Sequence, residues 1–238
     1  MELRRQSVRS QIEVNNLSDE RKLKDSLYQE LARIGKSLSS PKRLEILDLL
    51  AQGPKSVEEL SKATTMSVAN VSQHLQTLHH SKMVTSHKEG NFVIYELIDE
   101  GVADFLETLH TLSEKQYMEI QQIKKEFLNA DHDIDRISLE ELNERMEKGE
   151  ILLLDVRPQS EFENSHIPGA VSMPVEELEE KLRTLPTNQE IVAYCRGTYC
   201  LMATKAVELL KEQGLKAYRL QEGIQDWQEF QESSQKTK

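Results

Sequence analysis

Only two cysteines occur in this chain of 238 residues, Cys195 and Cys200, and both lie in the stretch YCRGTYCLMA at 194–203. Two cysteines in so many residues are too few for the disulfide scaffold of a secreted protein. In a reducing compartment, a cysteine pair is catalytic, metal-bound or idle more often than it is structural. A zinc site needs two ligands beyond this C-x4-C pair, and only His166 is a nearby candidate. We therefore expect no metal and no cofactor, and chemistry at a thiol.

The CRGTYC loop at 195–200 lies between a predicted strand and a predicted helix. EIVAYC at 190–195 predicts a strand that ends at the loop, and LMATKAVELL at 201–210 predicts the helix that follows. Backbone N–H groups converge at the start of a helix, where the helix dipole adds partial positive charge. We therefore expect the loop to lower the pKa of Cys195 and to raise its thiolate fraction. Gly197 allows the loop to bend without a steric penalty.

Strand and helix signals alternate through the second half of the chain, which we expect to form a domain at 137–232. The capping box Ser138-Leu139-Glu140-Glu141 starts a helix, and the apolar run ILLLDV at 151–156 is typical of a strand covered on both faces. The alternation predicts an α/β domain with a mostly parallel sheet and helices on both faces. The stretch NADHDIDR at 129–136 predicts a linker, and residues 233–238 a flexible tail.

Four motifs of this half resemble the rhodanese (sulfurtransferase) domain: LLLDVRPQSEF at 152–162, SHIPGAVSMP at 165–174, VAYCRGTYC at 192–200 and GIQDW at 223–227. The resemblance implies a rhodanese-like fold in which Cys195 is the nucleophile. Its thiolate would attack the outer sulfur of thiosulfate or another sulfane donor, such as a polysulfide. The sulfur would remain on Cys195 as a persulfide and then pass to a thiol acceptor.

The resemblance also implies roles for the residues around Cys195. Backbone amides of the loop would surround the persulfide, and they belong to Arg196, Gly197, Thr198, Tyr199 and Cys200. The Arg196 guanidinium would hold an anionic donor, and the residues that would support the loops are Asp155, Arg157 and His166. The chain departs from the family at Ser165, where glycine is more common. Related phosphatases carry an arginine at the position of Leu201, so the sequence favours sulfur chemistry over phosphate chemistry.

Two roles remain open for Cys200. In the first, it attacks a persulfide on Cys195 and closes a disulfide or polysulfide bridge. In the second, it is a small buried residue that starts a helix. The i, i+5 spacing across a curved loop is wide for an unstrained bridge.

The first half predicts a mainly helical domain at 18–128 behind a flexible tail at 1–17. Caps or an initial proline mark four helix starts, which lie at Ser18, Ser40-Pro41, Ser56 and Ser67. Two alternating segments, MVTSHK and NFVIYEL, flank Glu89-Gly90 and predict a β-hairpin. Helices followed by a hairpin, with the short connection TTM before the last helix, are the order of a winged helix-turn-helix.

Three motifs in this order resemble the ArsR family of bacterial repressors: SSPKRLEILDLL, SVEELSKATTMSVANVSQHLQTL and the wing MVTSHKEGNFVIYEL. The resemblance covers about residues 20–125 and implies binding to double-stranded operator DNA, with the helix after Ser67 in the major groove. The residues it places at the DNA face are Ser67, Val68, Asn70, Ser72, Gln73 and His74. Those it places near phosphates are Lys42, His87 and Lys88.

Two apolar stripes of the first half have no evident cover within it. One runs through Leu23, Leu27, Leu31, Ile34 and Leu38, and the other through Val102, Phe105, Leu109, Leu112, Ile120, Ile123 and Phe127. A second copy of the chain is the cover we expect, so the regulator is predicted to be a homodimer. Metal sensing is not predicted, because SVEELSK lacks cysteine and Asp104 and His110 are six residues apart.

Charge is distributed unevenly along the chain. Residues 1–99 hold 14 Lys and Arg against 13 Asp and Glu, whereas the remainder carries a net charge of −12. The overall acidity therefore says little about DNA binding by the first half. The start, MELRRQSVRS, lacks the apolar core of a signal peptide, and no apolar run is long enough to span a membrane. We expect a cytoplasmic protein with no membrane partner.

These features predict a DNA-binding transcriptional regulator in which a persulfide at Cys195 couples sulfane sulfur or redox signals to DNA binding. The alternative is an enzyme, primarily a thiosulfate or polysulfide sulfurtransferase, with an accessory DNA-binding domain.

Overall fold

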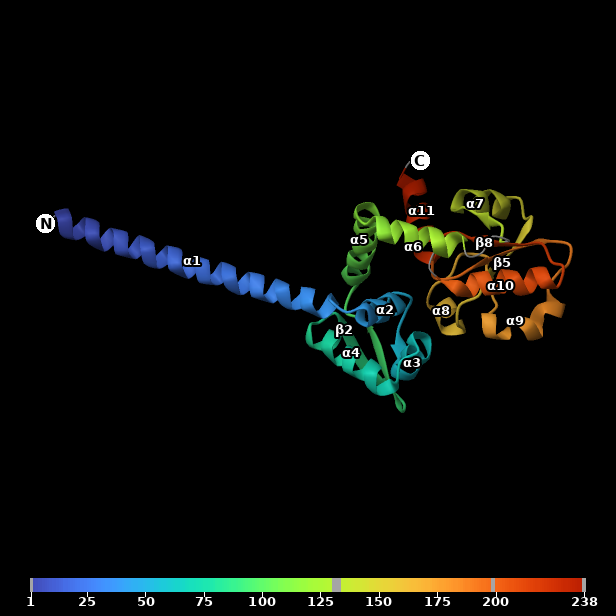
Figure 1. Cartoon of the computed structure of the whole chain (residues 1–238), viewed down its shortest axis with the longest axis horizontal. Coiled ribbons are helices and arrows are strands. Elements are labelled where there is room, and N and C mark those ends of the chain that lie inside the picture. Colours follow the sequence, from blue (N-terminus) through green and yellow to red (C-terminus); the bar gives the residue numbers. More distant parts are fainter. Residues whose placement is uncertain (1, 130–133, 198–199, 237–238) are drawn as a thin grey trace. The chain divides into compact units, whose positions relative to one another are not determined.

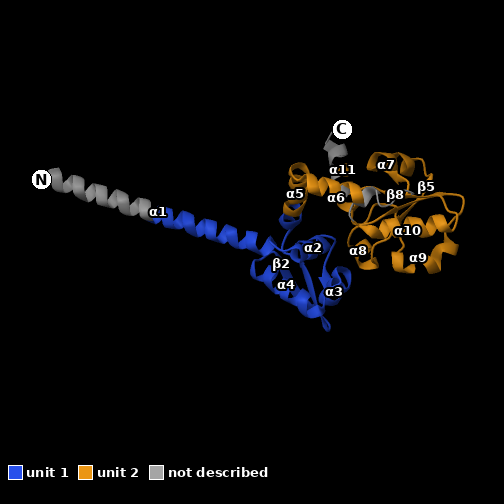
Figure 2. Cartoon of the chain, viewed as in Figure 1, with its two compact units in different colours: residues 1–104 blue, residues 105–238 orange. Residues whose placement is uncertain are grey.

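The structure is a computed structural model that describes residues 2–129, 134–197 and 200–236. They form two compact units that divide after Asp104 (Figures 1 and 2). The division falls within helix α5 (Glu100–Gln116), not at the predicted linker 129–136. The difference has a local cause, because the chain continues as helix through α5 and α6 (Met118–Asn129) up to the point where we expect the first domain to end.

The first unit contains the predicted winged helix-turn-helix. Its elements before α5 are α1 (Glu2–Leu38), α2 (Pro41–Leu50), β1 (Lys55–Ser56), α3 (Val57–Thr64), α4 (Val68–His80), β2 (Val84–Glu89) and β3 (Phe92–Leu97). A capping box fixes the start of α3, since the Ser56 hydroxyl accepts from the Glu59 amide and the Glu59 carboxylate accepts from the Ser56 amide. Thr65 then adopts a left-handed φ of 54°, and Ser67 caps α4 by accepting from the Asn70 amide.

An antiparallel sheet of order β1-β3-β2 completes this unit. The hairpin of β2 and β3 turns at Gly90, whose φ of +59° favours glycine, as the sequence predicts. Strand β1 is not predicted, because two residues give no alternating pattern. The core between the helices is built from fully buried aliphatic side chains, among them Ile46, Leu47, Leu60, Val71 and Leu75.

Helix α1 begins at Glu2, whereas the sequence analysis expects a tail up to residue 17 and a helix start at Ser18. The segment contains neither proline nor glycine before Gly35, so no residue type interrupts a helix there. Caps mark where a helix can begin, and Ser18 is therefore an internal residue of α1 rather than its start.

The second unit contains a five-stranded sheet of order β4-β8-β7-β5-β6, with every neighbouring pair parallel. This confirms the predicted α/β domain with a parallel sheet. Its elements after α6 are β4 (Arg136–Ile137), α7 (Leu139–Glu147), β5 (Ile151–Asp155), α8 (Gln159–Asn164), β6 (Val171–Ser172), α9 (Val175–Lys181), the short 3-10 helix η1 (Leu182–Thr184), β7 (Glu190–Tyr194), α10 (Leu201–Glu212), β8 (Ala217–Leu220) and α11 (Ile224–Lys236).

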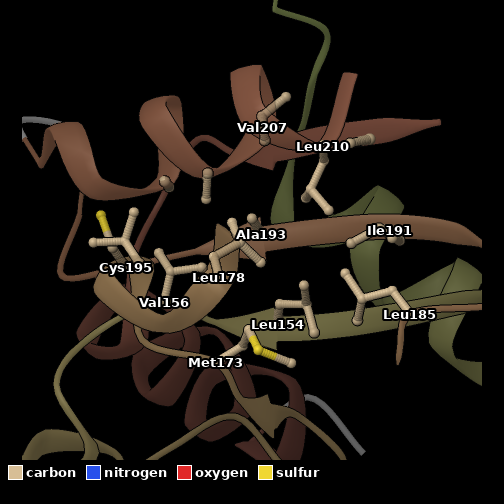
Figure 3. Close-up of a cluster of buried hydrophobic side chains, with 14 of the residues drawn as sticks. Leu154, Val156, Met173, Leu178, Leu185, Ile191, Ala193, Cys195, Val207 and Leu210 are labelled. Atoms are coloured by element: carbon tan, nitrogen blue, oxygen red, sulfur yellow. The ribbon is translucent and has the colours of Figure 1, made fainter. Parts of the chain in front are cut away.

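Successive residues of the central strand β7 alternate between two hydrophobic clusters. Ile191 and Ala193 belong to the cluster that includes residues of α9 and α10, while Val192 and Tyr194 belong to the one that includes residues of α7 and α11. Helices therefore cover both faces of the sheet. Figure 3 shows the first cluster, with Cys195 at one end of it.

Among the described residues, no helix combines the length and the hydropathy that a membrane span requires. Within the same part of the chain, no three His, Cys, Asp or Glu side chains gather in a way that could hold a metal ion.

Candidate functional site

Cys195 directly follows strand β7 and therefore lies at the carboxyl edge of the parallel sheet. Tyr194, the last residue of β7, pairs with Asp155, the last residue of β5. Because parallel strands end at the same edge, the segments that follow β5 and β7 meet there. This edge is where α/β folds place their ligand sites.

The Cys195 side chain is enclosed by the apolar cluster and is 2% exposed. Its thiol donates to the carbonyl oxygen of Cys200, with an Sγ–O distance of 3.5 Å, and lies 3.9 Å from that of Gly197. A carbonyl oxygen only accepts, so these contacts need a protonated sulfur. Burial is the largest cause that raises the pKa of Cys195 well above its ordinary value.

Cys200 is the N-cap residue of α10 and is half-buried. The neighbouring Cys195 thiol, the backbone amides of Met202 and Arg196 and the Arg196 guanidinium all favour the charged form of its sulfur. Together these effects outweigh burial and lower the pKa of Cys200 to about 6, and the Cys195 thiol is the largest of them. Within the pair, the surroundings therefore favour the proton on Cys195 and the negative charge on Cys200.

The expectation that Cys195 has the lowered pKa is therefore wrong. The start of α10 does stabilise a thiolate, but the first cysteine is too deeply buried to carry the charge. The second cysteine is also within reach of the first, because the Cys200 amide donates to the Gly197 carbonyl at 3.1 Å and folds the loop back. That amide is thus not directed at a persulfide. Thr198 and Tyr199, two further residues of the expected amide cradle, lie outside the described residues.

The Arg196 guanidinium is bound to a carboxylate. Its Nε and Nη2 atoms donate to Glu161 of α8, at distances of 2.6 to 3.2 Å, and Glu161 is 1% exposed. Two of its three nitrogen atoms thus face a buried anion, and its expected role, to hold an anionic donor, stays a prediction. The pair ties the cysteine loop to the segment after β5. Sequence reasoning missed Glu161 because it lies in a short polar helix with the pattern of a solvated surface.

Arg219 of β8 is a second buried cation beside the cysteines. Its Nη2 atom donates to the Cys200 carbonyl at 3.2 Å, and its Nη1 atom donates to the Thr204 hydroxyl of α10 at 2.7 Å. The Cys200 carbonyl thus accepts from both Arg219 and the Cys195 thiol. Arg219 is not among the predicted site residues. The sequence signal for it is a charged residue within the predicted strand KAYRL, where a buried strand would otherwise be apolar.

Asp155 and Arg157 are buried and bind each other, with an Nη2–Oδ2 distance of 2.6 Å. Arg157 also donates to the Ser165 carbonyl at 2.6 Å, which fixes the segment after α8. His166 is exposed in that segment, with Nδ1 at 2.9 Å from the Phe162 carbonyl and its ring stacked on that of Phe162. These contacts are consistent with the expected support of the loops by the three residues, which stays a prediction.

Gly223, just before α11, lies directly against the cysteine loop. A β-carbon at this position would be 2.1 Å from the Arg196 carbonyl oxygen and 2.7 Å from the Gly197 amide nitrogen. Both atoms belong to the backbone, so a side chain here would displace the loop itself. The sequence analysis places Gly223 in a family motif without this role.

Helix α4 carries the residues expected at the DNA face. Its buried side is aliphatic, with Val71, Leu75 and Leu78 in the core. Of the expected DNA-facing residues, the exposed ones are Ser67, Val68, Asn70 and Gln73, and the half-buried ones are Ser72 and His74. The hydroxyl of Ser67 is used in part as the helix cap.

The expected phosphate-binding residues differ in their surroundings. Lys42 is half-buried and donates to Glu45 at 2.7 Å and to the Thr64 carbonyl at 3.3 Å, so its charge is partly neutralised. His87 and Lys88 lie exposed on β2, and His87 is 3.7 Å from the Glu96 carboxylate on β3. Lys88 is thus the member of this set with the clearest access to a phosphate.

Two family models match separate parts of the chain. Residues 40–86 match the bacterial regulatory protein, arsR family, and residues 138–230 match the rhodanese-like domain. The chain is 37% identical over 204 residues to the HTH-type transcriptional regulator Rv0324 of Mycobacterium tuberculosis. The aligned residues cover 86% of this chain and 89% of that protein.

Solved structures resemble each part separately. The homodimeric winged helix-turn-helix DNA-binding domain of Mb0332 from Mycobacterium bovis is 35% identical, with a TM-score of 0.38, and the match covers 39% of this chain and 86% of that one. A rhodanese-related protein from Thermoplasma volcanium is 28% identical, with a TM-score of 0.36, and the match covers 40% of this chain and 91% of that one.

The Gly223 contact predicts that Gly223→Ala lowers the free energy of unfolding by about 1–3 kcal/mol, because the loop backbone must move to admit a methyl group. Urea denaturation of the full chain measures this effect. Gly35→Ala is the matched control, since nothing lies within 4 Å of its β-carbon position and alanine favours a helix. Equal stability of Gly223→Ala and wild type would contradict the packing.

Proposed function

The chain belongs to the HTH-type transcriptional regulators that join an arsR-family DNA-binding domain to a rhodanese-like domain, and from this premise we propose that sulfur uptake by the rhodanese-like domain regulates its binding to operator DNA. Sulfane sulfur is held as a persulfide on Cys195. The observation that carries the proposal is the placement of two cysteines together at the start of α10, where the Cys195 sulfur lies 3.5 Å from the carbonyl oxygen of the N-cap residue Cys200 and the surroundings lower the pKa of Cys200. A pair in this state is ready to react with sulfane sulfur at neutral pH.

DNA recognition is assigned to the first turns of α4. In a helix-turn-helix, the N-terminal residues of the second helix contact base edges in the major groove. Asn70 and Gln73 are exposed there, and amide side chains form paired hydrogen bonds with adenine. The β2–β3 wing adds Lys88 as a phosphate contact. The face has few cations, so one copy of the chain binds DNA weakly.

A second copy of the chain supplies the other half-site. The stripe on α1 remains uncovered within the chain, with Leu23, Leu27 and Leu31 between 51% and 71% exposed. Phe105 and Leu112 of α5 are also about half exposed. Large apolar faces of this kind mark interaction sites, and a symmetric dimer covers them with the same surface of the partner. Phe127, the last residue of the predicted stripe, has a side chain outside the described residues.

The sulfur chemistry is a transfer between thiols. When thiosulfate is the donor, a cysteine thiolate bonds to its outer sulfur, the S–S bond breaks, and sulfite leaves with the electron pair. The outer sulfur remains on the protein as a persulfide. A small thiolate acceptor then attacks this sulfur and releases the cysteine. No step needs an oxidant or a metal.

The alternative proposal is a sulfurtransferase with an accessory DNA-binding domain. It is favoured by the extent of the two matches, because the rhodanese-like match covers 138–230 and the arsR-family match only 40–86. Both proposals require a location with chromosomal DNA, and we propose the bacterial cytoplasm. They differ in whether sulfur on the protein changes its affinity for DNA.

We predict that selection from random duplexes with the full chain enriches a pseudo-palindromic site. On that site, Gln73→Ala weakens binding by about 1–3 kcal/mol per half-site, because a paired contact to a base is lost. Fluorescence anisotropy measures the affinity. Gln76→Ala, the same change one turn further along the exposed surface of α4, is the control and has a smaller effect. No enriched sequence, or equal effects of the two changes, would contradict the assignment.

We further predict that Cys195→Ser abolishes sulfur transfer from thiosulfate to a small thiol acceptor. The serine hydroxyl can still donate to the carbonyls of Cys200 and Gly197, so the fold is retained. Sulfite release under multiple turnover measures the transfer, and thermal melting checks the fold. Transfer near the wild-type rate in a folded Cys195→Ser protein would show that Cys195 does not hold the sulfur.

A further inference from the structure

The two sulfurs of the pair differ in their access to solvent. Cys195 is 2% exposed and belongs to the apolar cluster that includes residues of α10, whereas Cys200, the N-cap residue of that helix, is half-buried. A donor that arrives from solvent therefore meets the sulfur of Cys200 before that of Cys195. Solvent access alone therefore predicts that a donor reaches Cys200 first and Cys195 second.

The hydrogen bonds order them in the same way. The Cys195 sulfur lies 3.5 Å from the Cys200 carbonyl oxygen and 3.9 Å from that of Gly197, and its single proton can be donated to either oxygen. The charged form of Cys200 is favoured by the amides of Met202 and Arg196 and by the positive charge of Arg196. Only the thiolate form of a cysteine attacks a sulfane donor efficiently. The more accessible sulfur is thus also the one whose thiolate its surroundings favour.

Arg219 of β8 also holds the cysteine loop in place. Its guanidinium donates to the carbonyl of Cys200, the same oxygen that accepts from the Cys195 thiol. This contact holds the backbone of the loop that carries both cysteines. Its second contact, to Thr204, lies one turn inside α10. The orientation of both sulfurs is therefore set by the packing of β8 against α10 and does not depend on a bound donor.

We propose that Cys200 makes the first bond to the incoming sulfur and that Cys195 receives the sulfur from it. This inference rests on the proposed function, in which the persulfide is held at Cys195. It assigns Cys200 the first attack on the donor, whereas the sequence leaves it as either a residue that attacks a persulfide on Cys195 or a small buried residue that starts a helix.

The two steps balance with thiosulfate as the donor. The Cys200 thiolate bonds to the outer sulfur, the S–S bond breaks, sulfite leaves with its electron pair, and Cys200 carries a persulfide. The sulfur of Cys195 then bonds to the outer sulfur of this persulfide while the inner S–S bond breaks. The electron pair of that bond returns to Cys200, which takes up the proton that Cys195 loses. Cys195 is left as a deprotonated persulfide and Cys200 as a thiol.

The test mixes the full chain with thiosulfate, traps persulfides with an alkylating reagent at short times, and locates them by peptide mass spectrometry. We expect sulfur on Cys200 first and on Cys195 later. In Cys200→Ser, loading of Cys195 slows by about tenfold or more, because a buried thiol has a small thiolate fraction at neutral pH. In Cys195→Ser, sulfur accumulates on Cys200 and stays there.

The variants are chosen so that they fold. Serine is a favoured N-cap residue, so Cys200→Ser preserves the start of α10. Cys195→Ala is used beside Cys195→Ser, because it leaves no hydroxyl in the apolar cluster, and both should accumulate sulfur on Cys200.

Two results separate this inference from the proposed function. Loading of Cys195 in Cys200→Ser at the wild-type rate, or no sulfur on Cys200 in both Cys195 variants, overturns the order proposed here while a persulfide at Cys195 stands. Absence of persulfide on either cysteine of the wild-type chain, with thiosulfate and with polysulfide, overturns the proposed function as well.

Discussion

The placement of the buried Cys195 thiol beside the half-buried Cys200, with 3.5 Å between the Cys195 sulfur and the Cys200 carbonyl oxygen, is the constraint on which the proposed chemistry of the second unit depends. Burial favours the proton on Cys195, and the amides at the start of α10 favour the negative charge on Cys200. Neither residue would have this state alone. A buried thiol without its neighbour would be inert at neutral pH, and an exposed thiolate without its neighbour would have no internal acceptor for sulfur. Together they form a pair whose members can attack and receive in sequence.

The rest of the unit holds this pair in place with buried ion pairs and close backbone packing. Arg196 is bound to Glu161, Arg219 to the carbonyl of Cys200, and Gly223 permits the backbone of α11 to approach the loop. Each contact joins the loop to a different element, namely α8, β8 and the start of α11. A buried charge that loses its partner is costly, so the loop has little freedom to place its sulfurs elsewhere.

Much of the fold follows from local signals in the sequence. The difference in pKa between Cys195 and Cys200 does not. The cap at Ser67, the turn at Gly90 and the apolar run at 151–156 each determine a short segment, and the structure contains all three as predicted. The start of α1 was missed because a good cap at Ser18 does not require the helix to begin there. The pKa of Cys195 depends most on burial, and the cluster that encloses it includes Val156 and Met173, which are distant in sequence and meet it only when the sheet forms. Residue types at 195 and 200 are the same, so no local rule separates them.

The central claim, that sulfur on the pair regulates DNA binding, is tested most directly by one titration. Operator DNA is titrated with the wild-type protein and with Cys195→Ser, each with and without polysulfide, under conditions in which both proteins are folded. The account predicts that polysulfide changes the wild-type affinity by about fivefold or more, within the usual range of coupling between two sites, and leaves Cys195→Ser unchanged. Equal responses of the two proteins would contradict it and would leave a DNA-binding protein with an independent sulfurtransferase domain.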